Sequence, residues 1–288
     1  PEERFVRALT EPLNQDPPAT FLFFRGDVSQ PRQQVTAAEL PILDSGQTTL
    51  LPENDDSLPT TGRRLTYARW LTSGSHPLVS RVLVNRVWMH HFGRGIVNTP
   101  GDFGYLGVRP THPELLDWLA SEFVEQGWSL KNLHRLMMLS TAYRQQSTRS
   151  PEKDAVDADN ELLSRMAMRR LDAESLRDAI LVITRKYNSH RYGPPVPVMA
   201  DKVGQFVIGI ENLNAGRPGA VLPMKGEDFR RSVYVQVRRS RPLGMLGTFD
   251  AAILEPNCTM RTQSTVTPQA LMMMNGRFVR TQSIYLAE

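Results

Sequence analysis

The chain has 288 residues, of which 40% are hydrophobic and 22% charged, a composition that excludes a disordered polypeptide and can supply a substantial apolar core. Its net charge of +4 is small for this length, so we do not expect it to bind nucleic acid. The single cysteine, Cys258, excludes an intramolecular disulfide, a CxxC metal motif and a CxxCH haem motif, and we expect no cofactor within this chain.

The cations are mostly arginine, because only five of the 34 Lys and Arg residues are Lys. Arginine tolerates burial better than lysine does, so many of these side chains are candidates for internal contacts. A GC-rich genome explains the same bias equally well. No apolar run approaches the roughly 18 residues that a membrane-spanning helix needs, so we expect no membrane span in this chain.

Residues 1–62 are rich in proline and carry one strand-like apolar run, Phe21–Phe24, which ends at Arg25-Gly26-Asp27. We interpret this segment as a linker with a strand that leads in from a preceding domain. The Arg-Gly-Asp triplet is also an adhesion motif, but three residues recur by chance too often to support that reading.

Helix signals are dense from Arg63 onward. Four helices are predicted to begin at a polar cap, at Thr111, Ser129, Asp172 and Thr267. Helical spacing predicts two buried stripes: Leu116, Leu119, Ala120 and Phe123, then Leu176, Ala179, Ile180 and Ile183.

Periodicity is lost between residues 189 and 228, which is long for an ordinary connection, so we expect a functional or mobile loop there. Alternation at Val233, Val235 and Val237 then predicts a strand. The fold class is therefore mainly α, with a multi-helix core, a small β element and long irregular loops. Residues 63–288 are predicted to form one helical domain.

Residues 77–92 are predicted to form a helix that is apolar on every side, and such a helix is usually buried. We therefore expect its polar side chains to be at least partly buried and to need partners. We interpret Arg81, Asn85, Arg86 and His90 as a structural polar network, in which spacing places Arg81 beside Asn85 and Arg86 beside His90.

The segment that follows this helix is rich in glycine and carries Asp102 and His112, close in sequence to His91 at the helix end. Imidazole and carboxylate groups serve both as metal ligands and as acid–base catalysts, so His91, Asp102 and His112 are the candidate catalytic residues. Their spacing matches no metal-ligand template, which leaves the metal unknown and favours a structural network over a catalytic site.

Other catalytic motifs are absent, including GxSxG, HExxH, GxxxxGK[ST] and CxxC. Asp172 and Glu174 are explained by capping and by the helix dipole. The pairs Arg169-Arg170, Arg230-Arg231 and Arg238-Arg239 would suit an anion patch, although a solvated face or internal salt bridges are favoured.

Several long strings resemble a domain of unknown function that is abundant in planctomycete proteins, over about residues 63–288. The first run is HPLVSRVLVNRVWMHHFGRG, residues 76–95, followed by TPGDFG at 99–104 and THPELLDWL at 111–119. The resemblance continues in RLDAE at 170–174, RRSVY at 230–234 and TPQAL at 267–271.

The resemblance implies an architecture rather than an activity. Members are typically large exported proteins in which a cytochrome c-like module precedes this domain, often encoded beside polysaccharide-degradation genes. It implies haem c in an upstream domain, a periplasmic or otherwise extracytoplasmic location, and partners among the other domains of the same polypeptide or a glycan-processing or electron-transfer protein. We expect a non-catalytic scaffold or docking domain; the alternative is a hydrolase or redox enzyme acting on glycans.

Overall fold

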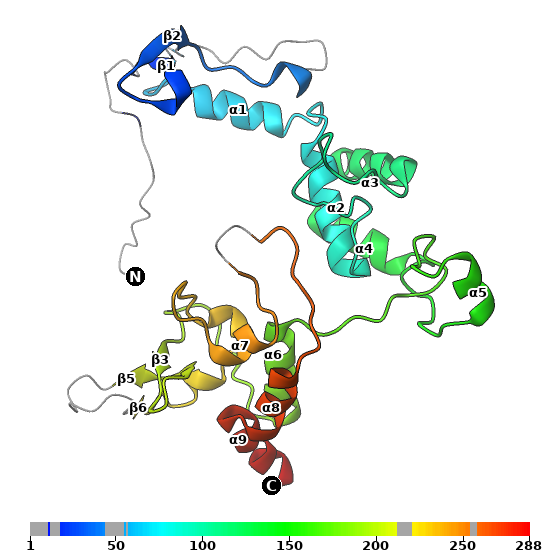
Figure 1. Ribbon diagram of the computed structural model, residues 1–288, viewed down its shortest axis with the longest axis vertical. Helices are drawn as coiled ribbons and strands as arrows, with labels where there is room; N and C mark the ends of the chain where they lie inside the picture. The colour runs from blue at the N-terminus through cyan, green and yellow to red at the C-terminus, as the bar shows by residue number, and fades with distance from the viewer. Residues whose placement is uncertain (1–10, 12–17, 44–54, 56, 212–220, 254–257) are drawn as a thin grey trace. The chain divides into compact units, whose positions relative to one another are not determined.

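The computed structural model describes the chain except for residues 1–10, 12–17, 44–54, 56, 212–220 and 254–257 (Figure 1). The described residues form nine α-helices and three small antiparallel sheets, so the prediction of a mainly α fold is confirmed. They divide into two compact units, Pro1–Ala167 and Met168–Glu288. The boundary between the two units falls inside residues 63–288, after Ala167, and each unit is described by itself.

Unit 1 begins with a two-stranded sheet and continues as helices. Strand β1 (Thr20–Phe23) pairs with β2 (Pro31–Val35), in a register that sets Thr20 opposite Val35. The strand predicted at Phe21–Phe24 is therefore confirmed. The helices are α1 (Arg63–Leu71), α2 (Val79–Phe92), α3 (Pro113–Glu125), α4 (Leu130–Leu139) and α5 (Pro151–Val156).

The core of unit 1 lies where α2, α3 and α4 contact one another (Figure 1). The stripe predicted for α3 is confirmed, because Leu116, Leu119, Ala120 and Phe123 are all buried. Trp88 stacks on Phe92 with ring centroids 3.9 Å apart. Burial of each large side chain of this kind stabilises the fold by roughly 1.5–3 kcal/mol.

The helices α3 and α4 begin in two different ways. The hydroxyl of Ser129 accepts a hydrogen bond from the backbone N–H of Asn132, as predicted, so α4 begins after a true side-chain cap. At α3 the capping position is His112 and no side chain bonds there, so the cap predicted at Thr111 is wrong. Pro113 at the first helical position, with its fixed φ, starts that helix instead.

Unit 2 combines short helices with short strands. Its helices are α6 (Ala173–Ile183), α7 (Gly244–Thr248), α8 (Thr267–Asn275) and α9 (Arg277–Ala287). Its strands are β3 (Val198–Ala200), β4 (Phe206–Ile208), β5 (Ile210–Glu211) and β6 (Val221–Leu222), paired β3 with β4 and β5 with β6. The long segment 189–228 therefore carries regular structure that its sequence pattern did not predict; residues 212–220 of it lie outside the described part.

The strand predicted around Val233 is wrong. Residues Ser232–Tyr234 form a 3₁₀ turn, and only Val235 makes a bridge, to Val196. Val233 is 70% exposed and Val237 is 73% exposed. The alternating pattern is overridden because Asp178 holds the backbone N–H and the hydroxyl of Ser232, both at 2.7 Å, and so fixes the chain in a turn.

The stripe predicted for α6 is also wrong. The helix buries Ala173, Arg177 and Leu181, whereas Ile183 is 63% exposed. The apolar core of unit 2 is small, with Val196, Val198, Val235 and Leu243 at its centre. Arg177 is a buried residue of α6. A rule based on the spacing of apolar residues cannot predict a buried arginine.

No helix in the described part of the chain is both long and apolar enough to cross a membrane.

Candidate functional site

The histidine at the end of α2 lies against α4. His91 Nε2 and His134 Nδ1 are 2.7 Å apart in a hydrogen bond, and the His91 ring meets the Tyr143 ring edge-on at 5.5 Å. His134 is exposed and His91 is partly buried. His134 was not among the residues predicted from sequence.

The other two candidate catalytic residues bond within their own loops. Asp102 Oδ1 accepts the backbone N–H of Gly104 at 2.8 Å, and His112 Nδ1 lies 3.0 Å from the hydroxyl of the adjacent Thr111. Among the residues that the structure describes, no three His, Cys, Asp or Glu side chains lie close enough to hold a metal ion. His91, Asp102 and His112 therefore do not form a metal site.

The polar residues of α2 have divergent surroundings. Asn85 is fully buried: its side chain donates to the carbonyl of Val97 and accepts from the N–H of Val97, both at 2.9 Å. Arg81 reaches outward to Asp117 at 2.7 Å and to the carbonyl of Pro77. The prediction that Arg86 and His90 are partly buried is wrong, because both are exposed; the apolar residues of α2 do not cover its whole circumference.

In unit 2, two buried arginines connect separate segments: Arg177 joins α6 to residues 228–230, and Arg230 joins that segment to the chain before β3. The Arg177 guanidinium donates to the carbonyls of Arg230 at 2.9 Å and Asp228 at 2.7 Å, and burial lowers its pKa to about 10. Arg230 donates to the carbonyls of Pro194 and Tyr192 and lies over the Tyr234 ring. The expectation of internal arginines is thus confirmed at these two positions, each 1% exposed.

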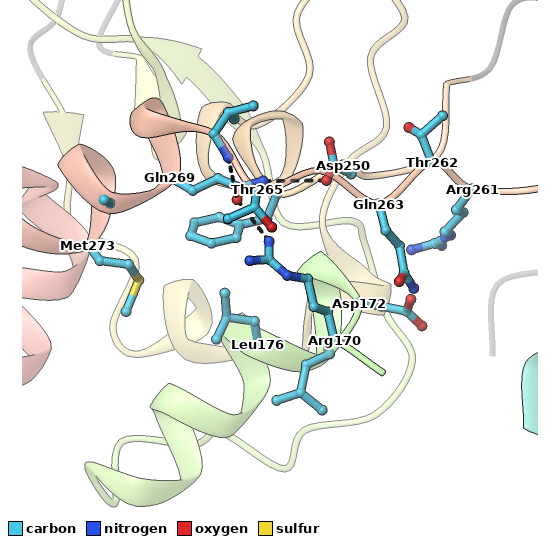
Figure 2. Close-up of a pocket in the computed structure, with 14 residues that line it drawn as sticks. Arg170, Asp172, Leu176, Asp250, Arg261, Thr262, Gln263, Thr265, Gln269 and Met273 are labelled. Atoms are coloured by element: carbon cyan, nitrogen blue, oxygen red, sulfur yellow. Dashed lines mark hydrogen bonds between the residues drawn. The ribbon is translucent and has the colours of Figure 1, made fainter. Parts of the chain in front are cut away.

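A cavity of about 420 Å³ lies where α6, α7 and α8 meet (Figure 2). We call it the α6–α8 pocket; it is lined by Arg170, Leu171, Asp172, Leu176, Phe249, Asp250, Arg261, Thr262, Gln263, Thr265, Val266, Gln269, Ala270 and Met273. A second cavity of about 830 Å³ shares Asp172 and Arg261 with it and extends along Asp178, Arg231 and Arg238. We call this second cavity the adjoining groove.

Gln269 fixes the geometry of the pocket wall. Its Oε1 accepts a hydrogen bond from Arg170 at 3.0 Å (Figure 2). Its Nε2 donates to the carbonyl of Thr248 at 3.1 Å. Arg170 also donates to the carbonyl of Ser264. One buried amide therefore joins the start of α6, the end of α7 and the start of α8, although these segments are far apart in the sequence.

Two carboxylates at this site, Glu174 and Asp250, are held in their charged forms. Arg261 bonds both oxygens of Glu174, at 2.6 and 3.1 Å. Burial alone would raise the pKa of Glu174, but the bonds from Arg261 and from its own backbone N–H outweigh burial and lower it. The N–H and hydroxyl of Ser264 lower the pKa of Asp250.

The pocket keeps polar groups available to a ligand. Asp172, Thr262, Gln263 and Thr265 have no side-chain hydrogen bond to any other described residue, and all four are exposed. The pocket lining also contains apolar side chains, Leu176, Phe249 and Met273 among them. An apolar lining with a few convergent polar groups is the usual composition of a binding pocket.

The residues of this site were visible in the sequence only as strings. RLDAE, RRSVY and TPQAL carry the resemblance to the family, but their spacing in the sequence does not show that they meet. The family model of PSD1, a protein of unknown function (DUF1553), matches residues 63–288 of the chain. The chain belongs to this family. No curated protein and no solved structure matches it. The three strings of this PSD1 domain line the pocket or the adjoining groove.

Proposed function

We propose that the chain is a non-catalytic docking domain, and that the α6–α8 pocket with its adjoining groove receives a segment of another domain of the same polypeptide. The observation that carries this proposal is the junction of two cavities, about 420 and 830 Å³, at Asp172 and Arg261. A polypeptide segment would use both volumes and would reach the polar side chains of the first cavity that make no hydrogen bond within the described chain.

The electrostatics favour binding over acid–base chemistry. A general acid at neutral pH needs a raised pKa, whereas the pKa values of Glu174 and Asp250 are lowered. The neighbouring arginines, Arg170 and Arg261, make hydrogen bonds to Gln269 and Glu174 that join secondary-structure elements. A pocket built in this way is preorganised, which reduces the entropy lost on binding.

The wider setting of the proposal comes from the family resemblance. We propose that the full protein is exported, that haem c is bound by an upstream module, and that the assembly takes part in polysaccharide degradation in the periplasm or outside the cell. Within that assembly, this chain would hold the electron-transfer module or a glycan-processing partner in place.

The competing hypothesis is a glycan-active enzyme that uses His91, Asp102 and His112. It receives no comparable support, because Asp102 and His112 take their hydrogen bonds from their own loops and His91 bonds His134. We therefore assign the function to unit 2.

A substitution that fills the pocket tests the proposal. Ala270 is exposed and lines the pocket from α8, so Ala270→Phe would occupy the cavity without disturbing a buried contact. Met274→Phe is the matched control, because Met274 is 72% exposed on the same helix and does not line the pocket.

The measurement is calorimetric titration of the chain with the haem-bearing upstream region of the same protein. We expect the unsubstituted chain and Met274→Phe to bind alike and Ala270→Phe to bind at least about tenfold more weakly. Equal binding by all three proteins would contradict the pocket assignment. Glycan turnover that is lost with His91→Ala would support the enzyme instead.

A further inference from the structure

A second binding surface lies in unit 1, between α3 and α4. A groove of about 720 Å³ is lined by residues of α2, α3 and α4 and of the segment that follows α4. Its lining is mostly apolar, and the less exposed apolar residues, which we call the floor, are Trp88, Leu115, Leu119, Leu136, Met137, Ala142 and Leu163. The polar residues of the lining are Gln126, Asn132, Arg135 and Ser140. We call this the α3–α4 groove.

The rim of the groove carries large side chains that face solvent. Trp118 is 51% exposed and Leu139 is 65% exposed. Tryptophan and arginine are the residues most enriched among those that dominate the energy of protein interfaces. An exposed Trp at the edge of an apolar groove is therefore a marker for recognition.

The groove has a single charged residue, Arg135 on α4. Its guanidinium has no hydrogen-bond or ion-pair partner in the part of the chain that the structure describes. The neighbouring Asn132 has no side-chain bond there either, although its backbone N–H bonds Ser129. A ligand that complements this groove must bring apolar groups for the floor and a negative charge for Arg135.

The composition of the floor decides which class of ligand fits. A sugar would place hydroxyl groups over leucine, methionine and alanine, where they would lose water and gain no partner. An extended peptide would leave its N–H and C=O groups equally unpaired over that floor. An α-helix satisfies its own backbone, so its apolar face can enter the groove without that cost.

We propose that the α3–α4 groove binds an acidic amphipathic helix of a partner protein. Its apolar residues, spaced at i, i+4 and i+7, would fill the floor, and an Asp or Glu at the edge would pair with Arg135. Trp118 would cover the apolar face of the helix from the α3 side. This site is independent of the α6–α8 pocket, since every residue that lines it belongs to unit 1.

The experiment is selection of a random 16-residue peptide library displayed on phage against the full chain. We expect enriched sequences to share apolar residues at i, i+4 and i+7 with at least one Asp or Glu. The most enriched peptide, synthesised with a fluorescent label, is then titrated with the full chain, and binding is read from fluorescence anisotropy.

Three variants locate the site. We expect Trp118→Ala to weaken binding about 30-fold and Arg135→Glu about tenfold. Arg144→Glu is the matched control: it makes the same charge change at an exposed arginine that does not line the groove, and it should alter binding less than twofold. Trp118→Phe should restore part of the binding, and circular dichroism should show that all four variants are folded.

Several results would overturn the proposal. Failure to enrich any peptide would do so, as would enriched peptides without acidic residues or helical apolar spacing, or equal binding by Arg135→Glu and Arg144→Glu. Trp118-dependent binding of cello- or xylo-oligosaccharides without peptide binding would assign the groove to sugars. Self-association lost with Trp118→Ala would assign it to a second copy of the chain.

Discussion

At the residue scale, Asn85 shows how one polar side chain fixes a backbone path. Its amide bonds both the N–H and the C=O of Val97, as a paired strand would, and so holds the loop after α2 against the helix. A Cβ on the intervening Gly95 would lie 2.4 Å from the carbonyl oxygen of Val97, so the close approach needs glycine. The sequence predicted a partner for Asn85 but gave no means of naming Val97.

Replacing Asn85 tests this reading. Asn85→Leu removes both bonds and leaves two buried backbone groups unsatisfied, so we expect the free energy of unfolding of unit 1 to fall by about 3 kcal/mol. Urea denaturation followed by circular dichroism provides the measurement. Arg86 is exposed at the next position of the helix. Arg86→Ala should therefore change the free energy of unfolding by less than about 0.5 kcal/mol. A similar small change for both variants would contradict the account.

Arg177 has the corresponding role in unit 2. Arg177→Met removes a buried guanidinium from two carbonyls and from the Ser232 hydroxyl, and we expect unit 2 to lose about 3 kcal/mol or more. Arg177→Lys should rescue little of this, because an ammonium cannot reproduce the fork of the guanidinium. The same denaturation measurement applies. Full rescue by lysine would show that charge alone matters at this position.

At the element scale, the start of α2 depends on a histidine. His76 is 7% exposed, and its Nδ1 accepts the N–H groups of Leu78 and Val79, at 3.1 and 3.2 Å. Its ring meets that of Trp70 edge-on at 4.3 Å. Burial lowers the pKa of His76, although the Glu39 carboxylate opposes the shift. The neutral imidazole, which alone can accept these bonds, is therefore the form that the fold stabilises.

The lowered pKa of His76 makes the stability of unit 1 fall as the pH falls. With a lowered folded pKa, the contribution of His76 is fully present above its unfolded value of about 6.5 and is lost as the pH falls through the folded value. We expect unit 1 to lose stability between about pH 7.5 and 5, and His76→Gln, which cannot titrate, to show a smaller loss. Denaturation curves at several pH values measure this; parallel losses in both proteins would contradict it.

Sequence patterns predict α3, whose buried face is a regular apolar stripe, but not β3, although Val198 is buried. The stripe of α3 has the expected residues because only apolar side chains, Leu116, Leu119, Ala120 and Phe123, are buried on that helix. The stripe of α6 could not be predicted, since Arg177 lies on the buried face and Ile183 on the exposed one. The same limit applies to the site: Gln269 and Arg170 connect elements about 100 residues apart, and no local pattern in the sequence reveals that contact.

At the scale of the whole molecule, each of the two units has its own buried core. We expect thermal unfolding, followed by calorimetry, to show two transitions. Asn85→Leu should lower the midpoint of one, and Arg177→Met should lower the midpoint of the other. A single transition that both variants shift equally would mean that the chain unfolds as one cooperative body.

The docking proposal is most directly tested by hydrogen–deuterium exchange of the full chain, alone and with the haem-bearing upstream region. Slower amide exchange at the start of α6, residues 170–176, and along residues 261–273 is the predicted result, because these segments line the α6–α8 pocket. Unchanged exchange in both segments, with protection around His91 and Asp102 on adding a glycan, would contradict it.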